Sequence, residues 1–311
     1  MKTAGKMPNP SFLEAHHPFR SAKAREKFLR LYDQRAKKWP IPSESRMVET
    51  SYGQTFVRIN GPADARPLVL LHGVSGNSLQ WQPNITALSQ SFRTYTLDNI
   101  YDQGRSVYTK PFSGPDDFVN WLDELFNTLD LGQDIKLMGL SYGGWLTAQY
   151  ALHFPKRLNK IILIAPAGTV LPLSFKWVVR AILCAIPRRR FTRSFMFWLL
   201  HDLAEQGPSG RASLERLVDE AYLASRSFKP KRLVNPTVLN DEQWGRMKVP
   251  ALFLVGENEK IYSAQKALER LREVAPQIET ELIPGAGHDL TVVQAEMIQD
   301  KVLNFLSGHD T

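Results

Sequence analysis

The sequence has very little cysteine and no long apolar run, and both shortages exclude classes of protein. A single cysteine, Cys184, leaves no partner for an internal disulfide and favours a reducing compartment, so we expect a cytoplasmic protein. The first residues carry charge but no apolar stretch of the kind that marks a signal peptide. The most apolar stretch, residues 171–186, is interrupted by Lys176 and Arg180 and is shorter than the roughly 20 residues of a membrane helix. We therefore expect no transmembrane segment.

Signatures of metal and cofactor binding are missing as well. The histidines and the single cysteine show no metal-ligand spacing, and the motif HExxH does not occur. We therefore predict neither a metal nor a cofactor.

The charge is positive overall but unevenly distributed. The net charge is +8, from 39 Lys or Arg and 31 Asp or Glu. Residues 1–46 carry 11 basic and 4 acidic residues, and residues 168–232 carry 12 and 5, so the rest of the chain is acidic. The three arginines at 188–190 are typical of a solvated surface, and without a nucleic-acid motif we expect no nucleic-acid partner. A weak contact with an anionic membrane surface stays open, as does the oligomeric state.

Apolar runs of strand length alternate with helical patterns along most of the chain. Several runs are apolar throughout, which is typical of strands covered on both faces. Residues 115–130 place apolar side chains at i, i+3, i+4, i+7, i+8 and i+11, the pattern of one helix face. The alternation predicts an α/β fold, with a mostly parallel central sheet and helices on both faces. The expected strands cover residues 56–59, 68–72, 94–98, 135–140, 160–165, 251–255 and 279–283.

Two segments interrupt this alternation. Residues 1–46 form a basic, partly helical N-terminal extension with an apolar face that can dock on the body. Residues 168–232 show several helical patterns and no strand pattern, so we expect a helical cap or lid inserted at a strand end. The α/β core would then comprise residues 47–167 and 233–311.

The sequence G-L-S-Y-G-G at residues 139–144 follows an expected strand and precedes a helical pattern. At such a junction, GxSxG forms a strained turn that exposes the serine above the sheet edge, at a helix N-terminus. The strand before and the helix after make the motif far more specific than five letters alone. We therefore predict that Ser141 is a nucleophile, against the alternative of a serine in an ordinary glycine turn.

A serine hydroxyl needs a base, and the base needs a carboxylate that fixes its tautomer. His288 lies in P-G-A-G-H-D-L directly after the last expected strand, at the edge where open α/β sheets gather their sites. V-G-E-N-E-K-I-Y, residues 255–262, follows the preceding strand and contains two carboxylates, Glu257 and Glu259. We predict Glu259 as the partner of His288, because it lies further into the loop, and keep Glu257 as the rival.

Two backbone N–H groups are candidates for an oxyanion hole. Tyr142 follows the predicted nucleophile directly, and Val74 follows the H-G step in L-V-L-L-H-G-V-S-G. We interpret His72 of that step as structural, because it shapes the turn.

In this order, H-G-V-S-G, G-L-S-Y-G-G and G-A-G-H resemble the α/β-hydrolase superfamily over residues 47–306. The chain is also similar to the bacterial carboxylesterases known as carboxylesterase NP or naproxen esterase. That family uses Ser, Glu and His, which the resemblance carries onto Ser141, Glu259 and His288, whereas most of the superfamily has Asp in place of Glu259. The stretches that carry the closer resemblance are W-P at 39–40, Y-G-Q-T at 52–55, P-L-V-L-L-H-G at 67–73, W-x-P-N-I at 81–85, G-L-S-x-G-G at 139–144 and G-E-x-E-x-I-Y at 256–262.

The predicted function is a serine carboxylesterase that hydrolyses small-molecule esters with apolar or aryl acyl groups through an acyl-enzyme. Two alternatives stay open: another serine acyl hydrolase (a thioesterase, lactonase or C–C bond hydrolase), and a non-enzymatic receptor that binds its ligand on the same fold. The large aromatic residues of the expected lid either line an apolar pocket or pack the lid on the body. They are Phe175, Trp177, Phe191, Phe195, Phe197 and Trp198.

Overall fold

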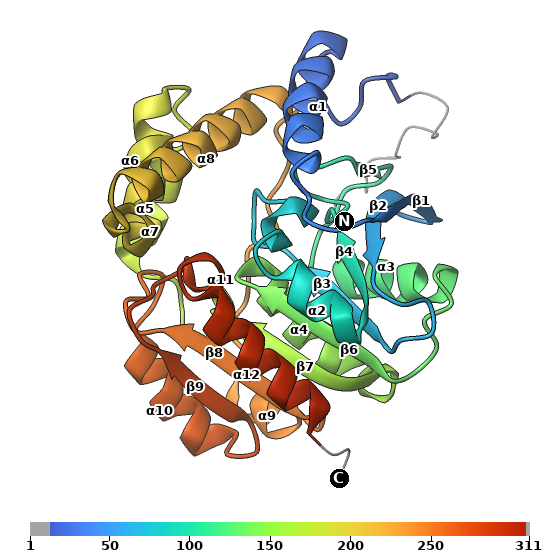
Figure 1. Ribbon diagram of the computed structural model, residues 1–311, viewed down its shortest axis with the longest axis vertical. Coiled ribbons are helices and arrows are strands. Elements are labelled where there is room, and N and C mark those ends of the chain that lie inside the picture. The colour runs from blue at the N-terminus through green and yellow to red at the C-terminus, as the bar shows by residue number, and fades with distance from the viewer. Residues whose placement is uncertain (1–12, 309–311) are drawn as a thin grey trace, which may run out of the picture.

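A nine-stranded sheet runs through residues 13–308, the part of the chain that the computed structural model describes (Figure 1). Its strands are β1 (Glu44–Thr50), β2 (Gly53–Asn60), β3 (Pro67–Leu71), β4 (Arg93–Leu97), β5 (Val107–Tyr108), β6 (Ile135–Leu140), β7 (Leu158–Ile164), β8 (Ala251–Gly256) and β9 (Glu279–Ile283). Their order is β1-β2-β4-β3-β6-β7-β8-β9, and β5 pairs with β2. The pairs from β4 to β9 are parallel, whereas β2 runs antiparallel to its three neighbours.

The predicted α/β fold with a mostly parallel sheet is confirmed, and each expected strand overlaps an observed one. Two observed strands had no signal in the sequence. Val48 is the one buried residue of β1, which lies at the edge of the sheet, and β5 is only two residues long. Neither strand is covered on both faces over several residues, so neither shows the β-branched or aliphatic run that predicts the other strands.

Helices cover both faces of the sheet, and an apolar core lies on each face. Successive side chains of a strand point to opposite faces and so enter the two cores in turn. In β3, Val69 and Leu71 face one core, whereas Leu68 and Leu70 face the other. The helices of the described residues are α1 (Ala22–Ala36), η2 (Ser78–Trp81), α2 (Ile85–Ser91), α3 (Pro115–Thr128), α4 (Tyr142–His153), η3 (Pro155–Arg157), α5 (Phe175–Leu183), α6 (Arg189–Leu199), α7 (His201–Glu205), α8 (Gly207–Ser227), α9 (Asp241–Gly245), α10 (Ala264–Val274), α11 (Leu290–Val293) and α12 (Ala295–Ser307). Residues of α3, α4 and α10 join the first core, and residues of α2 and α12 join the second. Between residues 13 and 308, no helix has both the length and the apolar character needed to span a bilayer.

Helices α5 to α8 form a group of their own beside the sheet (Figure 1). Along the chain they lie between β7 and β8. Two backbone N–H groups hold them to loops at the carboxyl ends of the strands: Ser174 donates to Ile261 O at 2.7 Å, and Leu203 donates to Asp289 Oδ2 at 2.7 Å. This helical group occupies the position where the sequence predicts a lid, and its role as a lid stays a prediction.

The N-terminal segment fastens the far end of α8. The rings of Phe19 and Phe228 lie 4.3 Å apart, Phe28 packs edge-on against Phe228 at 4.9 Å, and Arg20 N–H donates to Ser227 O at 2.8 Å. Figure 1 shows α8 reaching from the other insertion helices to α1. The apolar face expected in the basic extension thus docks on the insertion as well as on the core, while residues 1–12 of that extension lie outside the described residues.

Candidate active site

Ser141 lies between β6 and α4 on a turn that few residue types tolerate. Its φ of 56° falls in the left-handed region, which costs free energy for a residue with a side chain. The neighbouring positions must be glycine: a Cβ on Gly139 would lie 2.1 Å from Gly143 O, and a Cβ on Gly143 would lie 2.2 Å from Leu71 O. The two glycines therefore allow the strained turn that places Ser141 at the N-terminus of α4.

His288 and Glu259 form a buried pair. His288 Nδ1–H donates to Glu259 Oε2 at 2.9 Å, and the Glu259 side chain has no exposed surface. The other oxygen, Oε1, accepts the N–H groups of Lys260 and Ile261 at 2.7 and 3.0 Å. Both carboxylate oxygens are thus engaged. Because the carboxylate holds the hydrogen on Nδ1, Nε2 of the neutral ring is left as an acceptor.

The surroundings of His288 raise its pKa. Burial opposes the charged imidazolium, but the negative charge and hydrogen bond of Glu259, together with the charge of Asp289, outweigh burial and bring the pKa above its ordinary value. The site therefore makes His288 a stronger base than a free histidine.

The rival carboxylate, Glu257, faces a different group. Its Oε2 accepts the N–H of Gly285 at 3.2 Å, and the residue is exposed to solvent. Glu257 thus braces the loop before His288, and the carboxylate in contact with the imidazole is Glu259.

Ser141 and His288 follow β6 and β9, two parallel strands whose carboxyl ends lie at the same sheet edge. The loop that carries His288 passes closely over the end of β8, since a Cβ on Gly256 would lie 2.3 Å from Ala286 O. This path takes the loop across the sheet in the direction of β6. No hydrogen bond joins the side chains of Ser141 and His288 within residues 13–308. In ligand-free sites such contacts are often long and tighten when substrate binds.

The N–H groups of Val74 and Tyr142 have no protein acceptor among the described residues. Tyr142 lies in the first turn of α4, where N–H groups lack an acceptor within the helix. Val74 follows Gly73, which packs on the nucleophile: a Cβ on Gly73 would lie 3.3 Å from Ser141 Cβ. Two unengaged N–H donors therefore lie close to Ser141 along the chain or in space, one at the start of α4 and one on the loop after β3.

Asp102 fixes the loop that carries Val74, although no sequence motif pointed to it. Its carboxylate accepts the N–H of Ser75 at 3.0 and 3.1 Å. Burial raises the pKa of Asp102, and the ammonium of Lys231 opposes this shift. Lys231 Nζ in turn lies 4.8 Å from the ring centroid of Tyr101. In the sequence Asp102 is one of two acids after β4, and nothing there distinguishes it from Asp98.

Asp289 and Asp202 tie the loops that carry His288 and Glu259 to helix α7. Asp289, next to the base in sequence, is 3% exposed and accepts the N–H of Leu203 at 2.7 Å. Asp202 accepts from the side-chain amide of Asn258 at 2.8 Å, one residue before the acid. These contacts join residues 86 and 56 positions apart, so no local pattern in the sequence could have indicated them.

His72 uses both ring nitrogens in hydrogen bonds to the backbone, one in its own turn and one in the loop after β4. Nε2 accepts the N–H of Asn99 at 2.9 Å, so the hydrogen is on Nδ1, which donates to Gly73 O at 2.7 Å. The structural interpretation of His72 is confirmed.

The aromatic residues of the insertion differ in whether they pack on other side chains or are exposed. The Phe195 ring centroid lies 6.1 Å from that of Trp177 and 6.4 Å from that of Trp198, so these three half-buried rings pack on each other. Phe175 is 81% exposed, and the interpretation that it packs the insertion on the body is wrong for this residue.

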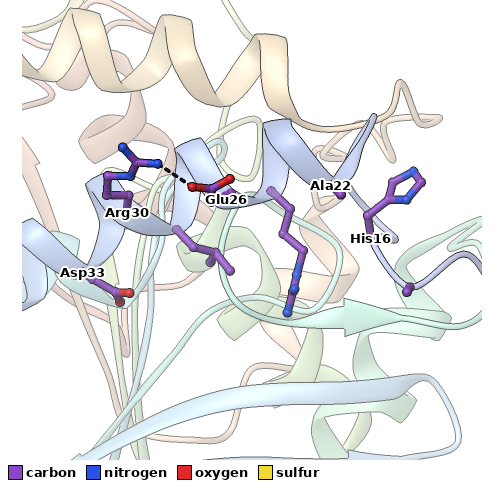
Figure 2. Close-up of a pocket in the computed structure, with 8 residues that line it drawn as sticks. His16, Ala22, Glu26, Arg30 and Asp33 are labelled. Carbon is purple, nitrogen blue, oxygen red and sulfur yellow. Dashed lines mark hydrogen bonds and ion pairs between the residues drawn. The ribbon is translucent and has the colours of Figure 1, made fainter.

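Away from these loops, an open hollow of about 530 Å³ lies beside α1 (Figure 2). The side chains around it include His16 and Asp33, and an ion pair joins Glu26 to Arg30 at 2.5 Å. It contains no nucleophile next to a base, and it supports no acyl-transfer chemistry. Within residues 13–308, no three His, Cys, Asp or Glu side chains cluster in a way that would hold a metal ion.

Comparisons with known proteins agree with the observed α/β fold. A family model described as alpha/beta hydrolase fold matches residues 66–293. The Bacillus subtilis protein carboxylesterase YbfK is 34% identical over 282 residues, which cover 91% of this chain and 94% of the relative. A second B. subtilis relative, the uncharacterized carboxylesterase nap, is 32% identical over 91% of this chain and 93% of its own length. The crystal structure of naproxen esterase (carboxylesterase NP) from B. subtilis superposes with a TM-score of 0.84 at 30% identity, covering 92% of this chain and 99% of that one.

Proposed function

The chain belongs to the alpha/beta hydrolase fold family, and within it we propose a carboxylic ester hydrolase whose catalytic triad is Ser141, Glu259 and His288. The observation that carries the proposal is the buried hydrogen bond of 2.9 Å between His288 Nδ1 and Glu259 Oε2. It leaves Nε2 as the basic nitrogen on a loop that crosses the sheet edge toward the strained turn of the serine. The relatives named as carboxylesterases support the same reaction class.

In the proposed mechanism, Ser141 Oγ attacks the ester carbonyl carbon while His288 Nε2 takes the hydroxyl proton. The carbonyl oxygen becomes an oxyanion that accepts hydrogen bonds from the N–H groups of Val74 and Tyr142. The C–O bond to the alcohol then breaks, and His288 gives its proton to the leaving alkoxide oxygen. Water, deprotonated by His288, hydrolyses the acyl-enzyme and restores Ser141. The positive end of the α4 dipole favours the oxyanion in both halves of the reaction.

For the substrate, we propose a small-molecule ester with an apolar or aryl acyl group. Three exposed aliphatic side chains belong to segments that border the proposed site: Val74 on the oxyanion loop, Val292 in α11 after the base, and Leu233. Leu233 precedes Val234, whose carbonyl accepts the Tyr142 hydroxyl at 2.8 Å. Aliphatic surface on the segments that border the proposed nucleophile favours apolar groups, because their burial is stabilising by about 25 cal/mol per Å². The cytoplasmic localisation favoured by the single cysteine stays a prediction.

The test is burst kinetics with p-nitrophenyl butyrate. Rapid release of one p-nitrophenol per enzyme, followed by steady turnover, is expected for an acyl-enzyme mechanism. Ser141→Ala should lower kcat by about 10⁴- to 10⁶-fold. Ser225→Ala, the same substitution on the exposed surface, serves as the matched control and should leave kcat unchanged. Full turnover by Ser141→Ala would contradict the triad, and tight binding of esters without turnover by the unmodified protein would identify a receptor instead.

A further inference from the structure

Helix α5 presents an apolar stripe to the outside of the molecule. None of its residues is buried. Its exposed aliphatic and aromatic side chains recur at i, i+3, i+4, i+7, i+8 and, one turn beyond the helix, i+11. In a globular protein this spacing is typical of a face that packs on a core. Here the stripe is open, and its residues are Phe175, Val178, Val179, Ile182, Leu183 and Ile186.

The opposite face of α5 already has its partner within the insertion. The ring of Trp177 lies 6.1 Å from that of Phe195 on α6. The guanidinium of Arg180 donates to Ser194 Oγ at 3.0 Å, also on α6. Because these contacts fix the inner face of α5, the stripe is held outward.

The stripe lies in a segment without acidic residues. Residues 169–201 contain six Lys or Arg and no Asp or Glu. Two of the six, Arg189 and Arg193, form ion pairs with Glu215 on α8 at 2.7 and 2.6 Å. The other cations near the stripe, Lys176, Arg188 and Arg190, are exposed and form no ion pair within residues 13–308.

We propose that α5 and the turn at residues 184–190 are a docking surface for an anionic lipid bilayer. An exposed apolar stripe bordered by unpaired cations fits a membrane interface, where the side chains enter the acyl region and the cations meet lipid phosphates. A second copy of the chain fits less well, because a two-fold contact through the stripe would bring the same cations of both copies together. This docking would place the insertion helices against the membrane and does not depend on the proposed triad.

The experiment is co-sedimentation of the full chain with vesicles of phosphatidylcholine, with and without 30% phosphatidylglycerol. We expect binding to the anionic vesicles only, and weaker binding as salt increases. Arg188→Gln with Arg190→Gln should weaken this binding by roughly 25-fold, since each cation near the surface contributes about a factor of five. Ile182→Ser with Ile186→Ser should weaken it as well, because the apolar insertion is lost.

A matched control removes two other exposed cations. Arg226→Gln with Arg246→Gln makes the same change in charge at the far end of α8 and on the core, and it should leave vesicle binding within about two-fold of the parent protein. Hydrolysis of p-nitrophenyl acetate and thermal unfolding check that each variant is folded. Because the arginine variant leaves the stripe intact, the proposal stays testable if the isoleucine variant does not fold.

Four outcomes would overturn the proposal. One is equal binding to neutral and anionic vesicles, and a second is parental binding by the arginine variant. A third is a dimer in solution that the isoleucine variant loses, which would assign the stripe to a second copy of the chain. The fourth is a raised KM for long-chain soluble esters in the isoleucine variant with vesicle binding intact, which would place the stripe in the path of the substrate.

Discussion

The loops at the sheet edge and helix α5 differ in whether their side chains have partners within the protein. At the sheet edge, the buried carboxylates of Glu259 and Asp289 accept hydrogen bonds on both oxygens. In α5, by contrast, no residue is buried, although one whole face of the helix is apolar.

The carboxylates at the sheet edge thus have their partners within the protein, whereas the apolar face of α5 is left exposed to water. On the proposed function the sheet edge needs only a substrate, because the proposed base and acid and the unengaged N–H donors are held by the fold before anything binds. Helix α5 keeps apolar surface in water, which costs free energy unless another surface covers it. Helix α8 lies between these extremes, since Leu214 and Val218 are buried and its end packs on α1. If this order holds, substitutions should have their largest effect at the sheet edge and their smallest effect on α5.

After Ser141→Ala, the largest effect is expected at the sheet edge, for Glu259→Gln. An amide cannot stabilise the imidazolium of His288 and can hold the wrong tautomer, so kcat should fall by about 10⁴-fold with the fold intact. Glu257→Gln is the matched control: it alters one exposed hydrogen bond, worth about 1 kcal/mol, and should change kcat by less than about five-fold. Steady-state kinetics on both variants checks the difference, and equal losses would contradict the assignment of Glu259.

Glu259→Gln should also change the pH dependence of kcat/KM. His288 must be neutral to act as a base, and its raised pKa should place the acidic limb of kcat/KM above the ordinary histidine value of about 6.5. In Glu259→Gln the carboxylate charge is lost while burial remains, so the pKa falls and the limb moves to lower pH. The residual activity of this variant, measured from pH 5 to 9, should show the shift. A limb that stays at the parental pH would mean that another group titrates.

The sequence predicts those structural features that depend on residues close together in the chain, and it does not predict contacts between distant segments. Seven strands are predicted because each contains a short run of β-branched or aliphatic residues, whereas the exposed edge strand β1 is not. Ser141 and Tyr142 are predicted from the sequence because the elbow needs glycines at fixed local positions. The bond from Leu203 to Asp289 is not, because it joins segments that only the folded chain brings together. The open stripe of α5 has the pattern of a buried helix face, so only the structure distinguishes the two.

An intermediate effect is expected where α1 anchors α8. Phe28 is 6% exposed and contacts the Phe228 ring, so Phe28→Ala should lower the free energy of unfolding by about 3–5 kcal/mol. Lys27→Ala, the same truncation on the exposed side of the helix, should change it by less than about 0.5 kcal/mol. Urea denaturation of both variants measures the difference. A neutral Phe28→Ala would show that the N-terminal segment does not hold the insertion.

The smallest effect is expected on α5 itself, and it bears most directly on the comparison. Ile182 is 65% exposed, so Ile182→Ala removes little buried surface and should change the free energy of unfolding by less than about 0.5 kcal/mol. Leu214→Ala on α8 removes a fully buried side chain and should cost about 2–5 kcal/mol. The two free energies are measured by urea denaturation at low protein concentration, so that association does not contribute. If Ile182→Ala costs as much as Leu214→Ala, protein already covers the stripe in solution, and the stripe is not available to a lipid surface.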